Sequence, residues 1–145
     1  MEPVRPPVFT PPHKKLFEGW HSITNMKVIM HNCGGIGDIL EDLAECGVDI
    51  INPVQISAHG MEPEMIKGRL GDRIIFYGGV YDAILLAGES EKVVYEKVKE
   101  NIGILSKGGG YLFAGVHNLP ADMSESHLRA MVAAYRDSAE NSELV

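Results

Sequence analysis

Four short apolar segments, each followed by a segment with helical periodicity, constrain the fold of this chain more than any other feature. The apolar segments are residues 27–30, 48–52, 73–77 and 111–116, and the helical segments after them are residues 38–46, 61–70, 90–105 and 124–140. Strands that are apolar on both faces are typical of parallel sheets covered by helices. The sequence therefore predicts an α/β fold of four parallel strands, preceded by a helix over residues 10–21 and an extended lead-in over residues 1–9.

The predicted helices have recognisable caps and apolar faces. Asp38, Ser90 and Ser124 precede three of them as candidate N-caps, and Gly47 follows one as a candidate C-terminal glycine. The apolar faces are expected to comprise Leu16, Phe17 and Trp20 in the first helix, Val94, Val98, Ile102 and Leu105 in the helix after Ser90, and Leu128, Met131, Val132 and Tyr135 in the last helix. These faces should pack against the sheet or against each other.

Four strand–helix units correspond to half of a closed (β/α)8 TIM barrel, which needs eight units and about 250 residues. The 145 residues here form one domain of that half size, unless the sheet is an open one. A half barrel leaves two sheet edges and an apolar inner face uncovered. We therefore expect the chain to self-associate, to pair with a second chain that completes the barrel, or to be a fragment of a longer protein.

The unusual residues of the chain follow its predicted strands. These segments are His31-Asn-Cys33, Asn52-Pro-Val-Gln55, Tyr77-Gly-Gly79 and Val116-His-Asn118. In parallel α/β folds the functional residues lie beyond the carboxyl ends of the strands. The sequence thus places its candidate chemistry along a single rim of the sheet.

His31 and Cys33 are the most specific of these candidates. Residues at positions i and i+2 of an extended chain point to the same face, and imidazole nitrogen and thiolate sulfur are preferred ligands of Zn²⁺. The pair is therefore a candidate half of a metal site. The alternative is that both residues only pack at a strand end, since a free cysteine often behaves as a small buried hydrophobe. Cys46, on a helix face, is expected in the core.

Charge and cysteine content exclude several classes of protein. The formal net charge is −7 without a run of Lys or Arg, which argues against a nucleic-acid-binding or anionic-membrane-binding surface. No apolar run approaches the ~20 residues of a membrane-spanning helix, and the N-terminus lacks the apolar core of a signal peptide. Two cysteines make no disulfide framework, so a reducing, cytoplasmic location is expected.

Six segments, in order along the chain, resemble the C-terminal half of the uroporphyrinogen decarboxylase superfamily. They are His31-Asn-Cys-Gly34, Gly47-Val-Asp-Ile-Ile-Asn-Pro-Val-Gln55, Gly60-Met-Glu-Pro63, residues 67–79, residues 88–93, and residues 109–113 with His117-Asn-Leu-Pro120. The resemblance extends over residues 12–135. It implies a TIM barrel whose N-terminal half is absent from this chain. The superfamily includes the decarboxylase and the zinc-dependent corrinoid (cobalamin) methyltransferases.

The methyltransferase branch is the closer match. In that branch the His-x-Cys segment binds zinc, and the third ligand is usually a cysteine three residues before a proline. Here that position is His117, three residues before Pro120, and the exchange keeps a competent zinc ligand. The resemblance thus implies a zinc site formed by His31, Cys33 and His117 with an open fourth position, which would serve methyl transfer to or from a corrinoid.

The decarboxylase branch gives the second expectation. That branch takes arginines and an essential aspartate from the N-terminal half, so His117 would be the remaining catalytic group, for removal of carboxyl groups from tetrapyrrole acetate side chains. A third alternative is an inactive half barrel or one subunit of a split barrel. The partners expected are a methyl donor or tetrapyrrole, with a corrinoid protein as a further candidate.

Three other rim residues are candidate substrate contacts. Asn52 and Gln55 could bind substrate or could satisfy backbone groups near a turn. Asp82, just after Gly78-Gly79, could belong to the site or could cap a helix. His117 itself could hold its loop by hydrogen bonds. His13, His21, His59 and His127 are expected to be solvated or capping residues.

Overall fold

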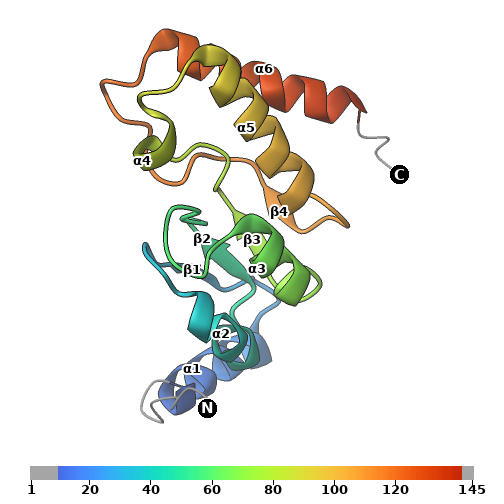
Figure 1. Ribbon diagram of the computed structural model, residues 1–145. Helices are drawn as coiled ribbons and strands as arrows, with labels where there is room; N and C mark the ends of the chain where they lie inside the picture. The colour runs from blue at the N-terminus through green and yellow to red at the C-terminus, as the bar shows by residue number, and fades with distance from the viewer. Residues whose placement is uncertain (1–9, 142–145) are drawn as a thin grey trace.

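The computed structural model, which describes residues 10–141, contains a four-stranded parallel sheet whose strands alternate with helices (Figure 1). The strands are β1 (Ile29–His31), β2 (Ile50–Asn52), β3 (Ile75–Tyr77) and β4 (Tyr111–Leu112), and they lie in the order β1-β2-β3-β4. Neighbours in the chain are thus neighbours in the sheet, as in part of a TIM barrel. The predicted α/β class is confirmed. The lead-in predicted over residues 1–9 lies outside the described residues.

Helices connect all four strands. They are α1 (Thr10–Ile23), the 3-10 turn η1 (Gly37–Ile39), α2 (Leu40–Cys46), α3 (Pro63–Leu70), α4 (Ala83–Leu86), α5 (Glu91–Leu105) and α6 (Glu125–Asn141). None of these helices has the length and apolar content needed to cross a membrane. The strands are shorter than the apolar segments that predict them. A helix after Asp82, here α4, is one of the two alternatives for that residue, and its bounds are not predicted from the sequence.

Two of the predicted N-caps and the C-terminal glycine are confirmed. Ser90 Oγ accepts a hydrogen bond from the N–H of Val93, and Ser124 Oγ accepts one from the N–H of His127. Gly47 ends α2 at φ 99°, a left-handed conformation that only glycine adopts without strain. The cap predicted at Asp38 is wrong, because this residue lies inside η1 and α2 starts without a side-chain cap.

The helix-facing side of the sheet forms the first core. Met30, Ile51, Phe76 and Tyr111 are aligned by the strand register in one row across the four strands. Ile51 and Phe76 are fully buried in this core. The opposite face is only partly covered within the described residues, because Ile29 is 56% exposed and Leu112 is 43% exposed, whereas Ile50 beside Ile29 is 8% exposed. A partly covered face of this kind is consistent with part of a TIM barrel.

A second core lies between α5 and α6, which run side by side at the end of the sheet away from α1 and α2 (Figure 1). The predicted face of α5 is confirmed, because all four of its residues are buried. The predicted face of α6 is only partly right, because Met131 is buried and Val132 is half-buried, while Leu128 and Tyr135 are exposed. The buried face of α6 includes two small residues, Ala130 and Ala134, which let this helix pack closely on α5.

Only part of the predicted face of α1 is buried. Phe17 packs against the first core. Leu16 is 64% exposed and Trp20 is 42% exposed. The helix packs mainly against α2. It is also joined to the fold by the hydrogen bond from His21 to Asp49.

The carboxylate of Asp49 ties the start of β2 to β1 and α1. It accepts hydrogen bonds from the N–H of Val28 at 2.8 Å, from Lys27 Nζ at 2.8 Å and from His21 Nε2 at 2.9 Å. Burial acts to raise the pKa of this carboxyl group, but the accepted hydrogen bonds outweigh it. The pKa of Asp49 is therefore below its ordinary value.

Replacing Asp49 with asparagine should lower the free energy of unfolding at pH 7 by about 1–2 kcal/mol. Because the pKa is lower in the folded chain than in the unfolded one, the stabilisation is complete above the unfolded-state pKa of about 4. It is lost as the pH falls through the folded-state pKa. The difference between the native protein and Asp49→Asn, measured by urea unfolding, should therefore shrink on acidification. Asp72→Asn, at an exposed position, is the matched control. Equal effects of the two substitutions would contradict this account.

Candidate metal centre

The carboxyl ends of the strands are joined by backbone hydrogen bonds that continue the sheet beyond its strands. The N–H of Asn32 donates to the carbonyl oxygen of Asn52 at 2.9 Å, and the N–H of Gly78 donates to the carbonyl oxygen of Leu112 at 3.0 Å. Farther along, the N–H of Val116 donates to the carbonyl of Tyr81 at 2.8 Å. The segment that carries His117 is thus paired with the segment after β3. All four strand ends are fixed to one rim.

Gly78 allows this close pairing of segments. Its φ is 97°, and a Cβ atom at this position would lie 2.6 Å from the carbonyl oxygen of Gly115. Any side chain would push away the segment that leads to His117. Gly78 and Gly79 therefore let the neighbouring segments approach closely, and they contribute no side chain to the candidate site.

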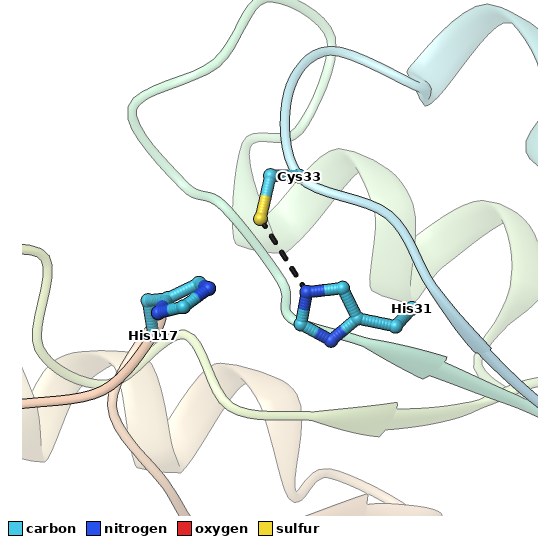
Figure 2. Close-up of side chains that lie close together, drawn as sticks. All are labelled: His31, Cys33 and His117. Atoms are coloured by element: carbon cyan, nitrogen blue, oxygen red, sulfur yellow. Dashed lines mark hydrogen bonds between the residues drawn. The ribbon is translucent and has the colours of Figure 1, made fainter.

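His31, Cys33 and His117 come together on this rim with their side chains pointing toward one another (Figure 2). One ligand atom from each residue lies within 4.8 Å of the other two. Cys33 Sγ is 3.6 Å from His31 Nε2, and the two imidazole rings meet edge to face with centroids 5.6 Å apart. All three side chains are exposed. The structure therefore brings together the three residues that the sequence nominates as metal ligands.

The spacing of Cys33 Sγ and His31 Nε2 suits a zinc ion. With Zn–S near 2.3 Å and Zn–N near 2.05 Å, tetrahedral geometry places a sulfur and a nitrogen ligand about 3.6 Å apart. Cys33 Sγ and His31 Nε2 are 3.6 Å apart. Two imidazoles and one thiolate also form a donor set that Zn²⁺ prefers over Mg²⁺ or Ca²⁺. The residues present thus fit the metal.

Asn52 and Gln55, the candidate substrate contacts, make hydrogen bonds that position the cluster. Asn52 Oδ1 lies 2.8 Å from His31 Nδ1. Since an amide oxygen only accepts, Nδ1 carries the proton, and the Nε2 lone pair faces Cys33. Gln55 Oε1 accepts from the N–H of Gly34 at 2.7 Å and so fixes the loop after Cys33. A direct substrate role for either residue stays a prediction.

Asp82 is buried, with 2% of its surface exposed, and acts as a helix cap. One carboxylate oxygen accepts from the N–H of Ile84 at 2.9 Å and caps α4, and the other accepts from the N–H of Ser57 at 3.2 Å. The capping alternative is thus observed. A substrate role for Asp82 stays a prediction.

Two small cavities flank the cluster. One, of about 220 Å³, is bordered by Cys33 and His117 and by residues after β3 and β4. The other, of about 170 Å³, is bordered by His31, His117 and Asn52. A ligand could therefore approach the three donor atoms from either side.

Sequence reasoning missed a buried contact behind the rim. His127 Nε2 lies 2.9 Å from the carbonyl oxygen of Glu89 and must donate to it, so the Tyr81 hydroxyl donates to Nδ1 at 3.1 Å. Burial, with a smaller contribution from the charge of Asp122, raises the pKa of Tyr81. His127 caps nothing and is not solvated. Its helical spacing to Ala130 and Ala134 would have placed it on the buried face of α6.

Cys46 is 1% exposed and packs in the core, which confirms its predicted role. Burial raises the pKa of its thiol. This second cysteine lies outside the cluster, and neither it nor Cys33 forms a disulfide within the described residues.

Comparison with known proteins identifies one related family. The family model described as uroporphyrinogen decarboxylase (URO-D) matches residues 8–138. No curated protein and no solved structure matches the chain.

The hydrogen bond from His31 to Asn52 predicts the tautomer of this histidine. In the metal-free native protein near pH 8, His31 should carry its proton on Nδ1, and Asn52→Ala should allow the Nε2–H form to appear, because Nδ1 loses its acceptor. Two-dimensional ¹H–¹⁵N spectra of the ring nitrogens measure this directly. Asn118→Ala, at an exposed rim position, should change nothing. An Nε2–H form in the native protein would contradict the assignment.

Proposed function

Because this chain belongs to the uroporphyrinogen decarboxylase (URO-D) family, we propose that it is a zinc-dependent methyltransferase of that family, moving a methyl group to or from a corrinoid. The observation that carries the proposal is the cluster of His31, Cys33 and His117, whose ligand atoms lie within 4.8 Å of one another. The cluster lies at the carboxyl ends of parallel strands, which is where enzymes with this kind of fold have their active sites.

Three protein ligands suit a catalytic zinc site better than a structural one. Structural zinc sites are usually closed by four protein ligands, whereas catalytic sites keep one position open for water or substrate. The exposure of all three side chains leaves room for such an exchangeable ligand. Bound there, zinc would lower the pKa of an incoming thiol so that it reacts as a thiolate at neutral pH.

The residues around the cluster would serve this chemistry by holding the ligands. Asn52 keeps the lone pair of His31 Nε2 directed at the cluster, and Gln55 holds the loop that carries Cys33. Partners of metal ligands that fix tautomer and orientation commonly change metal affinity by about 10–100-fold. The free thiol of Cys33 suits a reducing, cytoplasmic environment.

We further propose that the active catalyst needs a second four-stranded unit, from a second copy or another chain. The partly covered inner face, with Ile29 and Leu112 exposed, supports this. In the described range, β1 and β4 each pair with a single neighbour and leave an edge open. The cavities beside the cluster are too small for a macrocycle, so a corrinoid, free or carried by a partner protein, would lie across the rim. The isolated chain would supply the metal ligands but not the whole site.

Decarboxylation of a tetrapyrrole is the second candidate function. The family description favours it, and an exposed His117 on the rim could deliver a proton. That reaction needs no metal and assigns no role to Cys33. Metal binding therefore separates the two candidates.

The purified chain should bind one zinc ion. His31→Ala, Cys33→Ala and His117→Ala should each weaken zinc binding by more than about 100-fold, because loss of a direct ligand costs more than loss of its partner. Zinc analysis after equilibrium dialysis against a competing chelator measures the affinity. His13→Ala, which removes a histidine of α1 outside the cluster, is the matched control.

Because the three side chains are exposed, each variant should remain folded. Circular dichroism of each variant would show that any loss of zinc binding is not caused by unfolding. Zinc binding that survives all three ligand substitutions would rule out the proposed site. A native chain without zinc that decarboxylates a tetrapyrrole in the presence of its partner would establish the second candidate instead.

A further inference from the structure

The face of the sheet opposite the first core has a polar row at the carboxyl ends of its strands. His31 and Asn52 are register partners, and Ile51 and Phe76, the residues just before Asn52 and Tyr77, are partners as well. Ile51 and Phe76 are fully buried in the first core, and successive side chains of a strand point to opposite faces. His31, Asn52 and Tyr77 therefore lie side by side on the other face, at the rim that carries the cluster.

This polar row borders the smaller cavity beside the cluster. His117, Asn118 and residues 114–116 form the remaining border. No bordering residue in the described part of the chain is Asp, Glu, Lys or Arg, so only the imidazoles of His31 and His117 could give the cavity a charge. Its volume is about 170 Å³, and a cavity of about 150 Å³ can hold a molecule the size of benzene. The cavity therefore has room for a small polar group.

Two hydrogen-bond donors at this cavity have no acceptor among residues 10–141. Asn52 Oδ1 is engaged with His31 Nδ1 at 2.8 Å, which leaves the Nδ2 group of Asn52 with N–H bonds to donate. Neither this group nor the hydroxyl of the half-buried Tyr77 makes a hydrogen bond within the described chain. A ligand with two acceptor atoms could take both hydrogen bonds.

We infer that this cavity binds a carboxylate group of the substrate, with hydrogen bonds donated by Asn52 Nδ2 and the Tyr77 hydroxyl. A carboxylate fits because it has two acceptor oxygens and no donor, and hydrogen bonds to a charged group are stronger than those between neutral groups. The molecule that carries this carboxylate would be the methyl donor or acceptor. That assignment rests on the proposed function, whereas carboxylate binding itself does not.

The zinc ion and the second unit proposed above are both compatible with this site. Zinc held by His31 and His117 would place a positive charge next to the cavity and strengthen its attraction for an anion. A second unit packed on the inner face would enclose the cavity, and both donors would still come from this chain. The carboxylate would thus be held beside the open position of the metal and would orient the reacting end of the molecule.

Acetate and acetamide, which have nearly the same shape but differ in charge, test this inference. Titration of each into the native protein, followed by ¹H–¹⁵N NMR at constant ionic strength, measures their affinities with and without zinc. We expect acetate to bind at least roughly tenfold more tightly than acetamide. Tyr77→Phe, which removes one donor, should weaken acetate binding roughly tenfold, the usual effect of a hydrogen bond to a charged group. Tyr135→Phe, at an exposed position of α6, is the matched control.

Asn52→Asp tests the second donor without disturbing the metal ligands. Aspartate keeps an acceptor oxygen for His31 Nδ1, so zinc binding should persist. It replaces the donor at the cavity with a carboxylate oxygen, which would repel acetate. Acetate binding should therefore fall by more than about tenfold in this variant.

The possible results separate this inference from the proposed function. If acetate binds the native protein and Tyr77→Phe equally, or binds neither, the inference is wrong and the zinc-dependent function stands. If the native chain holds no zinc, the proposed function fails. Acetate binding to that zinc-free chain, lost in Tyr77→Phe and Asn52→Asp, would still support the carboxylate site.

Discussion

The parallel pairing of the four strands is the constraint on which the rest of the structure depends. It places every strand's carboxyl end at the same edge of the sheet, and backbone hydrogen bonds such as Val116 N–H to Tyr81 continue the pairing past the last strand. His31 at the end of β1 and His117 after β4, which are far apart in the chain, thereby come into ring contact. The glycine at position 78 is required because a side chain there would meet the backbone of the neighbouring segment.

The cluster itself is exposed, yet its geometry is held by groups behind it. The amide of Asn52 sets the tautomer of His31, and the amide of Gln55 fixes the loop after Cys33. His117 follows a backbone segment that is tied to Tyr81, whose hydroxyl is in turn bonded to the buried His127. Such support limits the loss of side-chain freedom when an ion binds. A polar, solvent-facing cluster can therefore be preorganised without being buried.

The sequence predicts the fold class well, because the fold class follows from local patterns, and it places His31 and Cys33 on one face of the chain, as the structure has them. Alternating apolar and helical segments define the α/β order, and the i, i+2 spacing of His31 and Cys33 places them on one face. What it does not predict depends on tertiary packing. The burial of His127 depends on how α6 packs against α5, and the exposure of Leu128 follows from the same contact. Asp38 has the residue type of a cap, but a 3-10 turn starts the helix earlier.

The cluster of His31, Cys33 and His117 leads to our central proposal, that this rim binds zinc through one sulfur and two imidazole nitrogens. X-ray absorption at the zinc edge of the zinc-loaded protein tests it most directly. The account predicts one sulfur near 2.3 Å and two histidine nitrogens near 2.0–2.1 Å, with one further exchangeable light-atom ligand. A first shell that contains only oxygen or nitrogen, or two or more sulfurs from protein, would contradict it.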